Sequence, residues 1–134
     1  MRSLVVISAC LLSCGEGPVL QNLRCSRGDR ACQADQHPHT IELSVDFEDA
    51  DGDLGRGLAH VLVEGDRQWT REASELFAEN GVALDATSGT LELRLDLTFS
   101  SFKLGKSFDV GIEVEDAAGH LSNDPSLRFR IVSP

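Results

Sequence analysis

Residues 41–48, Ile-Glu-Leu-Ser-Val-Asp-Phe-Glu, alternate strictly between apolar and polar side chains, and this alternation decides the fold class. The same period of two recurs in residues 91–99, Leu-Glu-Leu-Arg-Leu-Asp-Leu-Thr-Phe, and again in residues 108–115 and 127–131. A helix would spread both kinds of side chain around its circumference, whereas a strand places them on opposite faces. The four segments therefore predict strands with one buried and one solvated face, which is typical of antiparallel sheets.

Between these segments the sequence predicts further strands and turns. Residues 58–64 are mostly apolar, which indicates a fifth, central strand, and Trp69 is expected to anchor the core. Residues 72–79 fit either a short helical turn or an irregular strand, while Asn80-Gly81 and Ser88-Gly89 favour turns. We expect an all-β fold over residues 40–134: one antiparallel β-sandwich of six to seven strands, immunoglobulin-like or fibronectin-like.

The N-terminal segment has the pattern of an export signal. Arg2 precedes an apolar run from Leu4 to Leu12, which is too short to span a bilayer as a helix. The run ends in Leu11-Leu-Ser-Cys14, which resembles the lipobox of bacterial lipoprotein signal peptides. That resemblance implies a signal peptide over residues 1–13, acylation (palmitate) of Cys14, and a place in the bacterial cell envelope. Gly15 after the cysteine suggests the outer membrane.

A second lipobox-like stretch, Ile7-Ser-Ala-Cys10, lies just upstream. Cleavage before Cys10 would leave an apolar run shorter than signal peptides use. Length therefore favours Cys14, unless translation starts further upstream.

Residues 14–39 show no sustained period and are rich in glycine and proline, so we expect a lipid-anchored flexible linker. Cys25 and Cys32 lie within it, and in an exported chain two such cysteines are expected to form a local disulfide. A zinc site that adds His37 and His39 has unsuitable ligand spacing. The Arg-Gly-Asp tripeptide at residues 27–29 resembles integrin-binding loops, but three residues carry little information.

Two motifs at the ends of the predicted domain carry a family resemblance. Residues 45–55, Val-Asp-Phe-Glu-Asp-Ala-Asp-Gly-Asp-Leu-Gly, resemble the DxDGD segment of bacterial surface and exported immunoglobulin-like domains. Residues 114–123, Val-Glu-Asp-Ala-Ala-Gly-His-Leu-Ser-Asn, resemble the turn before the last strand of those domains, with His120 in place of the usual asparagine. The resemblance supports the sandwich and implies no particular function.

The first motif also contains a candidate ion site. Five carboxylates fall within eight residues, and Ca²⁺ takes six to eight oxygen ligands. The expected calcium ligands are Asp49, Asp51 and Asp53, with Asp116 or Asp124 if the final turn lies at the same end; Asp46 and Glu48 complete the five carboxylates. The spacing does not match an EF-hand, and a solvated turn without an ion explains the same residues.

Charge and motifs narrow the function classes. The net charge of −10 makes nucleic acid an unexpected partner, and no catalytic motif or substrate site is evident. We therefore expect a non-catalytic envelope lipoprotein whose sandwich is a structural or protein-binding module, with a protein partner in the envelope. The alternative is a calcium-stabilised cell-surface adhesion or carbohydrate-binding domain.

Overall fold

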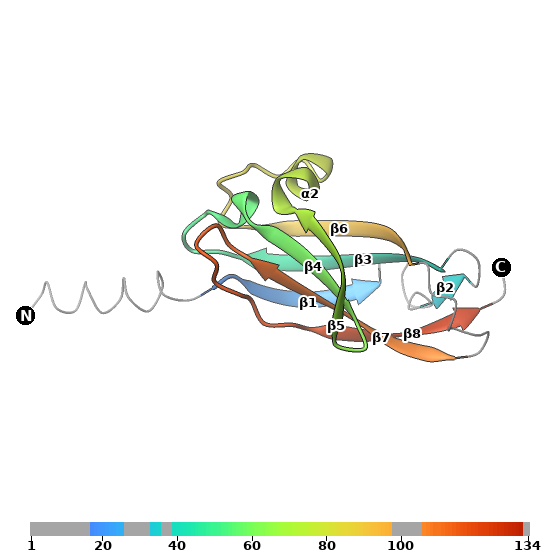
Figure 1. Cartoon of the computed structure of the whole chain (residues 1–134). Helices are drawn as coiled ribbons and strands as arrows, with labels where there is room; N and C mark the ends of the chain where they lie inside the picture. Colours follow the sequence, from blue (N-terminus) through green and yellow to red (C-terminus); the bar gives the residue numbers. More distant parts are fainter. Residues whose placement is uncertain (1–16, 26–32, 36–38, 98–105, 133–134) are drawn as a thin grey trace, which may run out of the picture.

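The computed structural model describes residues 17–25, 33–35, 39–97 and 106–132, and these form a sandwich of two sheets (Figure 1). The strands are β1 Val19–Cys25, β2 Gln33–Asp35, β3 His39–Glu48, β4 Leu58–Val63, β5 Asp66–Glu72, β6 Ser88–Leu97, β7 Ser107–Glu115 and β8 Ser126–Val132. One sheet has the order β1-β3-β6 and the other β2-β8-β7-β4-β5. All pairings in the described part are antiparallel except β2 with β8. The predicted all-β sandwich is confirmed.

The alternating segments supply the core, as their period predicts. In β3, Ile41, Leu43, Val45 and Phe47 are all buried, and in β7 so are Phe108, Val110, Ile112 and Val114. These two rows face each other from opposite sheets, which is how a sandwich buries one face of each strand. An aromatic pair, Phe108 with Phe129, packs β7 against β8 with 6.0 Å between ring centroids.

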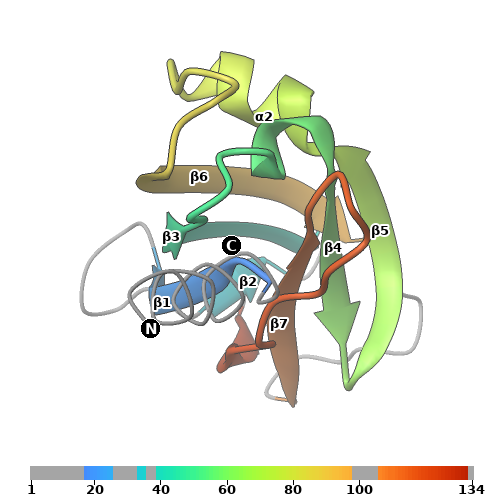
Figure 2. The same ribbon diagram turned by 90° about the vertical axis from the view of Figure 1, so that its left-hand side faces the viewer.

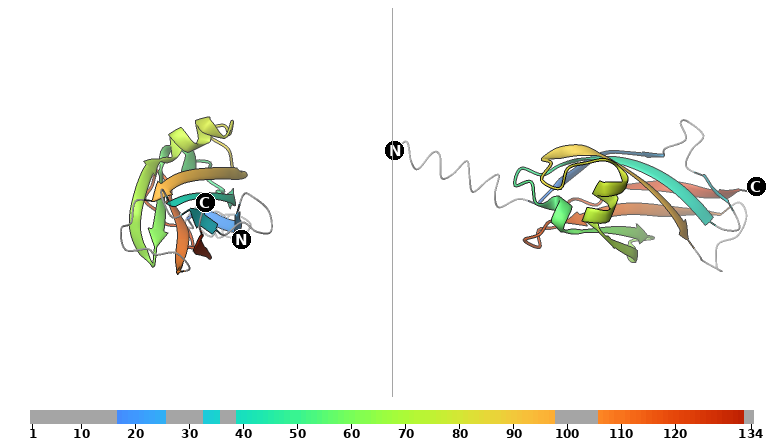
Figure 3. Two further views of the ribbon diagram at one scale, coloured as in Figure 1. Left: turned by 90° about the vertical axis from the view of Figure 1, so that its right-hand side faces the viewer. Right: turned by 90° about the horizontal axis from the view of Figure 1, so that it is seen from above.

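The structure tests two predictions for the middle of the chain: the central strand at residues 58–64, and the choice between helix and strand at residues 72–79. β4 lies between β5 and β7, so the predicted central position is confirmed. Glu72 ends β5 and residues 73–79 are helical: α2 spans Ala73–Glu79, and a 3-10 turn, η2, spans Leu54–Arg56. α2 contacts both β5 and β6 and closes that side of the sandwich (Figure 3). Its buried Phe77 packs on Phe47, with 5.1 Å between ring centroids.

The predicted linker over residues 14–39 was wrong for two segments. Residues 19–25 form β1, which pairs with β3, and residues 33–35 form β2, which pairs with β8. The alternation in β1 is hidden because its pairing with β3 shifts register between Gln21 and Arg24, where Asn22 has a φ of 54°. β2 has only three residues, too few to show a period. The sandwich therefore begins by residue 19 instead of residue 40.

Candidate metal site

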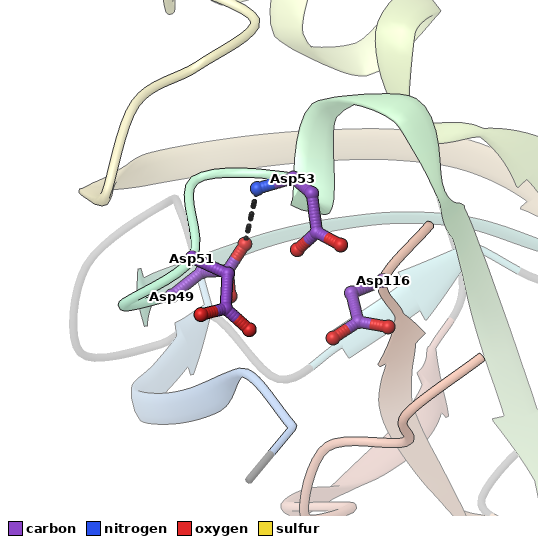
Figure 4. Close-up of side chains that lie close together, drawn as sticks. All are labelled: Asp49, Asp51, Asp53 and Asp116. Atoms are coloured by element: carbon purple, nitrogen blue, oxygen red, sulfur yellow. Dashed lines mark hydrogen bonds between the residues drawn. The ribbon is translucent and has the colours of Figure 1, made fainter. Parts of the chain in front are cut away.

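Four aspartates meet at one end of the sandwich (Figure 4). Asp49 directly follows β3, Asp51 and Asp53 lie in the turn before η2, and Asp116 directly follows β7. Each offers one carboxylate oxygen such that all four atoms lie within 4.8 Å of one another. Because β3 and β7 belong to different sheets, the group contains residues from both layers at this end.

Asp49 and Asp116 are the buried members of the group, each 2% exposed. Asp49 Oδ2 accepts hydrogen bonds from the backbone N–H groups of Asp53 at 2.9 Å and Leu54 at 2.7 Å. Asp116 Oδ1 accepts from the backbone N–H groups of Ala118 at 3.0 Å and His120 at 2.8 Å. Hydrogen bonds from backbone N–H groups satisfy these buried oxygens, so the donors offset part of the cost of burial.

The carboxylate of Asp53 has fewer hydrogen bonds to offset its burial than those of Asp49 and Asp116. Its Oδ1 atom is buried and has no hydrogen-bond partner. Burial first, and then the neighbouring carboxylates of Asp116 and Asp49, raise the pKa of Asp53. A buried acceptor without a partner costs about 1–3 kcal/mol, and a bound cation would satisfy it while relieving the repulsion among the carboxylates.

The donor set fits calcium better than the metals that prefer nitrogen or sulfur ligands. It consists of carboxylate oxygens alone, and two ligands on opposite sides of one Ca²⁺ ion, each about 2.4 Å away, lie roughly 4.8 Å apart. Exposed Asp51 would add a ligand from the solvent side, where water would complete the coordination. Gly52 allows the tight turn that carries these residues: its φ is 67°, and a Cβ there would lie 2.8 Å from the Asp85 carbonyl oxygen.

The five clustered carboxylates of the sequence do not act as one group. Glu48 and Asp124 are exposed, and neither belongs to the group of four. Asp46 points to a different set of partners: Asn22 Nδ2 donates to it at 2.9 Å, Thr90 Oγ1 at 2.8 Å and Arg24 at 3.2 Å. These hydrogen bonds, led by the one from Asn22, lower the pKa of Asp46. Asp46 and Glu48 lie within β3, on the face opposite its buried apolar residues, whereas Asp49, Asp51 and Asp53 follow the end of the strand.

The predicted cysteine sites fall largely outside the described residues. Cys10, Cys14 and Cys32 lie there, as do His37 and residues 27–29. Cys25 ends β1 and is half-buried. Acylation at Cys14 and the Cys25–Cys32 bridge therefore stay predictions.

Local structural partners are present for His60, His120 and Trp69. His60 is buried, and its Nδ1 lies 2.9 Å from Thr70 Oγ1. His120 Nδ1 lies 3.1 Å from Asp116 Oδ2, beside the four-aspartate group. Trp69 is half-buried against the core, and the guanidinium of Arg71 lies 5.7 Å from the centre of its ring.

Two asparagines that the sequence marked only as turn residues have structural roles. Asn123 binds the backbone of β1, and Asn80 binds the backbone of β6. Both strands are edges of the three-stranded sheet. No local pattern marks these residues beyond their positions in turns.

Comparison with known proteins places the chain by its fold. It resembles a solved structure described as the fibronectin(III)-like modules of CbhA from Clostridium thermocellum, with a TM-score of 0.51 and 12% sequence identity. The match covers 88% of this chain and 48% of that one, so the chain spans about half the length of that structure. No family model matches the chain, and no curated protein matches it. The likeness shows the fold alone, which is that of a fibronectin III-like β-sandwich.

The described residues contain no helix with the length and apolar character needed to span a bilayer.

Proposed function

We propose that this chain is a non-catalytic lipoprotein of the bacterial cell envelope, whose sandwich is a protein-binding or structural module stabilised at one end by calcium. The observation that carries the calcium part is the group of four aspartates, with the buried and unpartnered Oδ1 of Asp53 among them. An ion held between Asp49, after β3, and Asp116, after β7, would fasten the two sheets to each other. Fibronectin III-like folds suit such a passive role, because they present edges and loops to partners.

The remaining residues support a protein partner over a sugar. Carbohydrate-binding surfaces use exposed aromatic faces, but Trp69 is half-buried and Arg71 lies over its ring. A catalytic role has little support among the described residues, because buried His60 is bound to Thr70. The envelope location rests on the lipobox resemblance at Cys14, and the partner would be a protein of the same compartment.

Calcium binding is tested by thermal unfolding in excess Ca²⁺ and in chelator. We expect wild-type protein to unfold at a clearly higher temperature with Ca²⁺, because an ion that binds only the folded state stabilises it. Asp53→Asn should lose most of this shift, and in chelator it should unfold at a temperature no lower than wild type, because it removes a poorly compensated charge. Asp66→Asn, an exposed aspartate at the start of β5, is the matched control and should keep the full shift. An unfolding temperature that Ca²⁺ leaves unchanged would eliminate the site.

The anchor is tested separately in bacteria grown with labelled palmitate. Wild type and Cys10→Ala should both incorporate the label, whereas Cys14→Ala should not. Loss of label from Cys10→Ala alone would move the anchor to residue 10, and an unlabelled wild-type chain would remove it. Affinity capture of the acylated protein followed by mass spectrometry would then identify the partner.

A further inference from the structure

Three large hydrophobic side chains are exposed in the part of the chain that the structure describes, and all three lie at one end. Val19 is 40% exposed, Leu84 is 45% exposed and Leu121 is 47% exposed. Single exposed apolar side chains are ordinary on a protein surface, whereas several of them at one end of a domain favour a contact there. We call this group the apolar rim.

Local contacts fix where the apolar rim lies. Val19 pairs with Glu48, the residue before Asp49. Leu84 belongs to the loop after α2, and its carbonyl oxygen would lie 2.3 Å from a Cβ on Gly55, in η2. Leu121 is in the loop that follows Asp116. The three side chains therefore come from segments around the four-aspartate group, at the end that faces the viewer in Figure 2.

The N-terminal part of the chain joins the sandwich at the same end. Gly17 packs directly on the loop after β7, because a Cβ there would lie 2.3 Å from the Leu121 carbonyl oxygen. Cys14 precedes Gly17 by three residues, and three residues reach at most about 11 Å when fully extended. A lipid on Cys14 would therefore hold this end of the sandwich against the membrane, leaving no room for a long spacer.

We propose that this end of the sandwich rests on the leaflet that holds the acyl chains of Cys14, with the apolar rim in the interfacial layer. The inference rests on the proposed lipid anchor. Transfer of apolar side chains from water to the interface lowers their free energy, and the anchor supplies a high local concentration of lipid. Leu58, at the start of β4, is opposite Glu115 and so lies beside Asp116, whereas Val63, at the end of β4, is opposite Val110. The strand therefore runs away from the four-aspartate group, and the tip of the β4–β5 hairpin, at Gly65, lies away from the bilayer.

Charge determines which lipids this end accepts. The exposed carboxylates of Asp51 and Asp85 lie near the apolar rim, and anionic headgroups would repel them. A Ca²⁺ ion in the four-aspartate group reduces this negative charge. The contact should therefore form on zwitterionic lipid without added calcium, and on anionic lipid only with it.

The test uses the acylated mature protein in vesicles with brominated acyl chains, which quench a nearby tryptophan. Trp69 is first replaced by phenylalanine, and one new reporter is introduced: Leu121→Trp at the apolar rim, or Asp66→Trp beside the hairpin tip as control. Leu84→Trp reports on the rim through a second loop, in case Leu121→Trp does not fold. In brominated phosphatidylcholine we expect strong quenching at residue 121 or 84 and little at residue 66. In brominated phosphatidylglycerol the rim reporter should be quenched only when Ca²⁺ is present.

The possible results distinguish the docked orientation from the lipid anchor on which it depends. Protein that floats with the vesicles but shows equal quenching at the rim and at residue 66 would overturn the docked orientation while leaving the anchor intact. Protein that carries no acyl chain and does not float would overturn the anchor, and the docked orientation with it. Quenching in phosphatidylglycerol that ignores Ca²⁺ would overturn the role given to the ion.

Discussion

The side-chain amide of Asn123 pairs with both backbone polar groups of Leu20. Its Oδ1 accepts a hydrogen bond from the Leu20 N–H at 2.7 Å, and its Nδ2 donates to the Leu20 carbonyl oxygen at 2.8 Å. Leu20 lies opposite Phe47 in edge strand β1. Its N–H and carbonyl groups bind Asn123, so they face away from β3, as they do at a non-hydrogen-bonded pair of an antiparallel ladder. One side chain thus takes the place of a neighbouring strand.

We expect Asn123→Ala to destabilise the fold by about 1 kcal/mol, because it leaves a partly buried donor and acceptor of Leu20 without their side-chain partner. Urea unfolding followed by circular dichroism measures the change. Asn123→Asp keeps the acceptor but loses the donor, so it should also be less stable than wild type. Asp124→Asn changes the adjacent exposed residue and should be neutral. If Asn123→Ala unfolds at the same urea concentration as Asp124→Asn, the pairing contributes nothing.

Asn80 has the corresponding role at the other edge of the same sheet. Its Oδ1 accepts from the Glu92 N–H at 2.9 Å, and its Nδ2 donates to the carbonyl oxygens of Glu92 at 3.2 Å and Leu76 at 2.9 Å. The side chain therefore joins α2 to β6 and covers part of the edge of β6. Unpaired strand edges favour association between molecules.

Asn80→Ala should accordingly lose about 1 kcal/mol of stability and associate more readily as its concentration rises. Sedimentation velocity over a concentration series measures the association, and urea unfolding measures the stability. Ser74→Ala, a half-buried polar position at the start of the same helix, is the control. An Asn80→Ala protein as monomeric as this control would show that the rest of the edge is protected without Asn80.

Arg71 connects β5 to α2 and covers Trp69. Its Nη2 lies 3.0 Å from Glu75 Oε2 and 2.6 Å from Glu79 Oε1, and the hydrogen bond from Arg71 lowers the pKa of Glu79. Lysine keeps the charge but cannot bind both carboxylates with one planar group. Arg71→Lys should therefore cost about 0.5–1 kcal/mol and change the emission of Trp69.

Two measurements check the role of Arg71: urea unfolding at low and high salt, and the fluorescence spectrum of the folded protein. Glu79→Gln removes one carboxylate and leaves the cation over the ring, so its stability should fall while its emission stays close to wild type. The position would be only a solvated charge if Arg71→Lys matched wild type in both stability and emission.

The alternation of apolar and polar residues predicted most of the strands, and the features that it missed have identifiable physical causes. Ile41 to Phe47 point inward because alternate residues of a half-buried strand must do so. β1 escaped prediction because its irregular pairing around Asn22 breaks that alternation. The sequence could join Asp116 to the other three aspartates only on the condition that the final turn lies at the same end of the sandwich, and it left Asp124 as an alternative. Which oxygens face one another depends on backbone N–H donors such as Leu54, and these are not visible in a linear sequence.

His60 gives the fold a pH dependence of predictable sign. Burial first, and then the charge of Arg67, lower the pKa of His60, while Glu115 and Glu113 oppose the shift. The unfolded chain binds a proton at this residue below a pH of about 6.5, whereas the folded chain binds it only at a lower pH. Unfolding free energy should therefore fall as the pH is lowered from about 7.5 through 6.5, by no more than about 1.4 kcal/mol per pH unit from this group.

His60→Gln isolates this contribution, because glutamine can still bind Thr70 but does not titrate. The other three histidines are common to both proteins, so they cancel when the two pH profiles are subtracted. We expect the stability of wild type relative to His60→Gln to decrease toward acid pH in urea unfolding at several pH values between about 5 and 7.5. A relative stability that rises toward acid pH would mean that Glu115, whose Oε1 lies 4.0 Å from His60 Nε2, governs the titration instead.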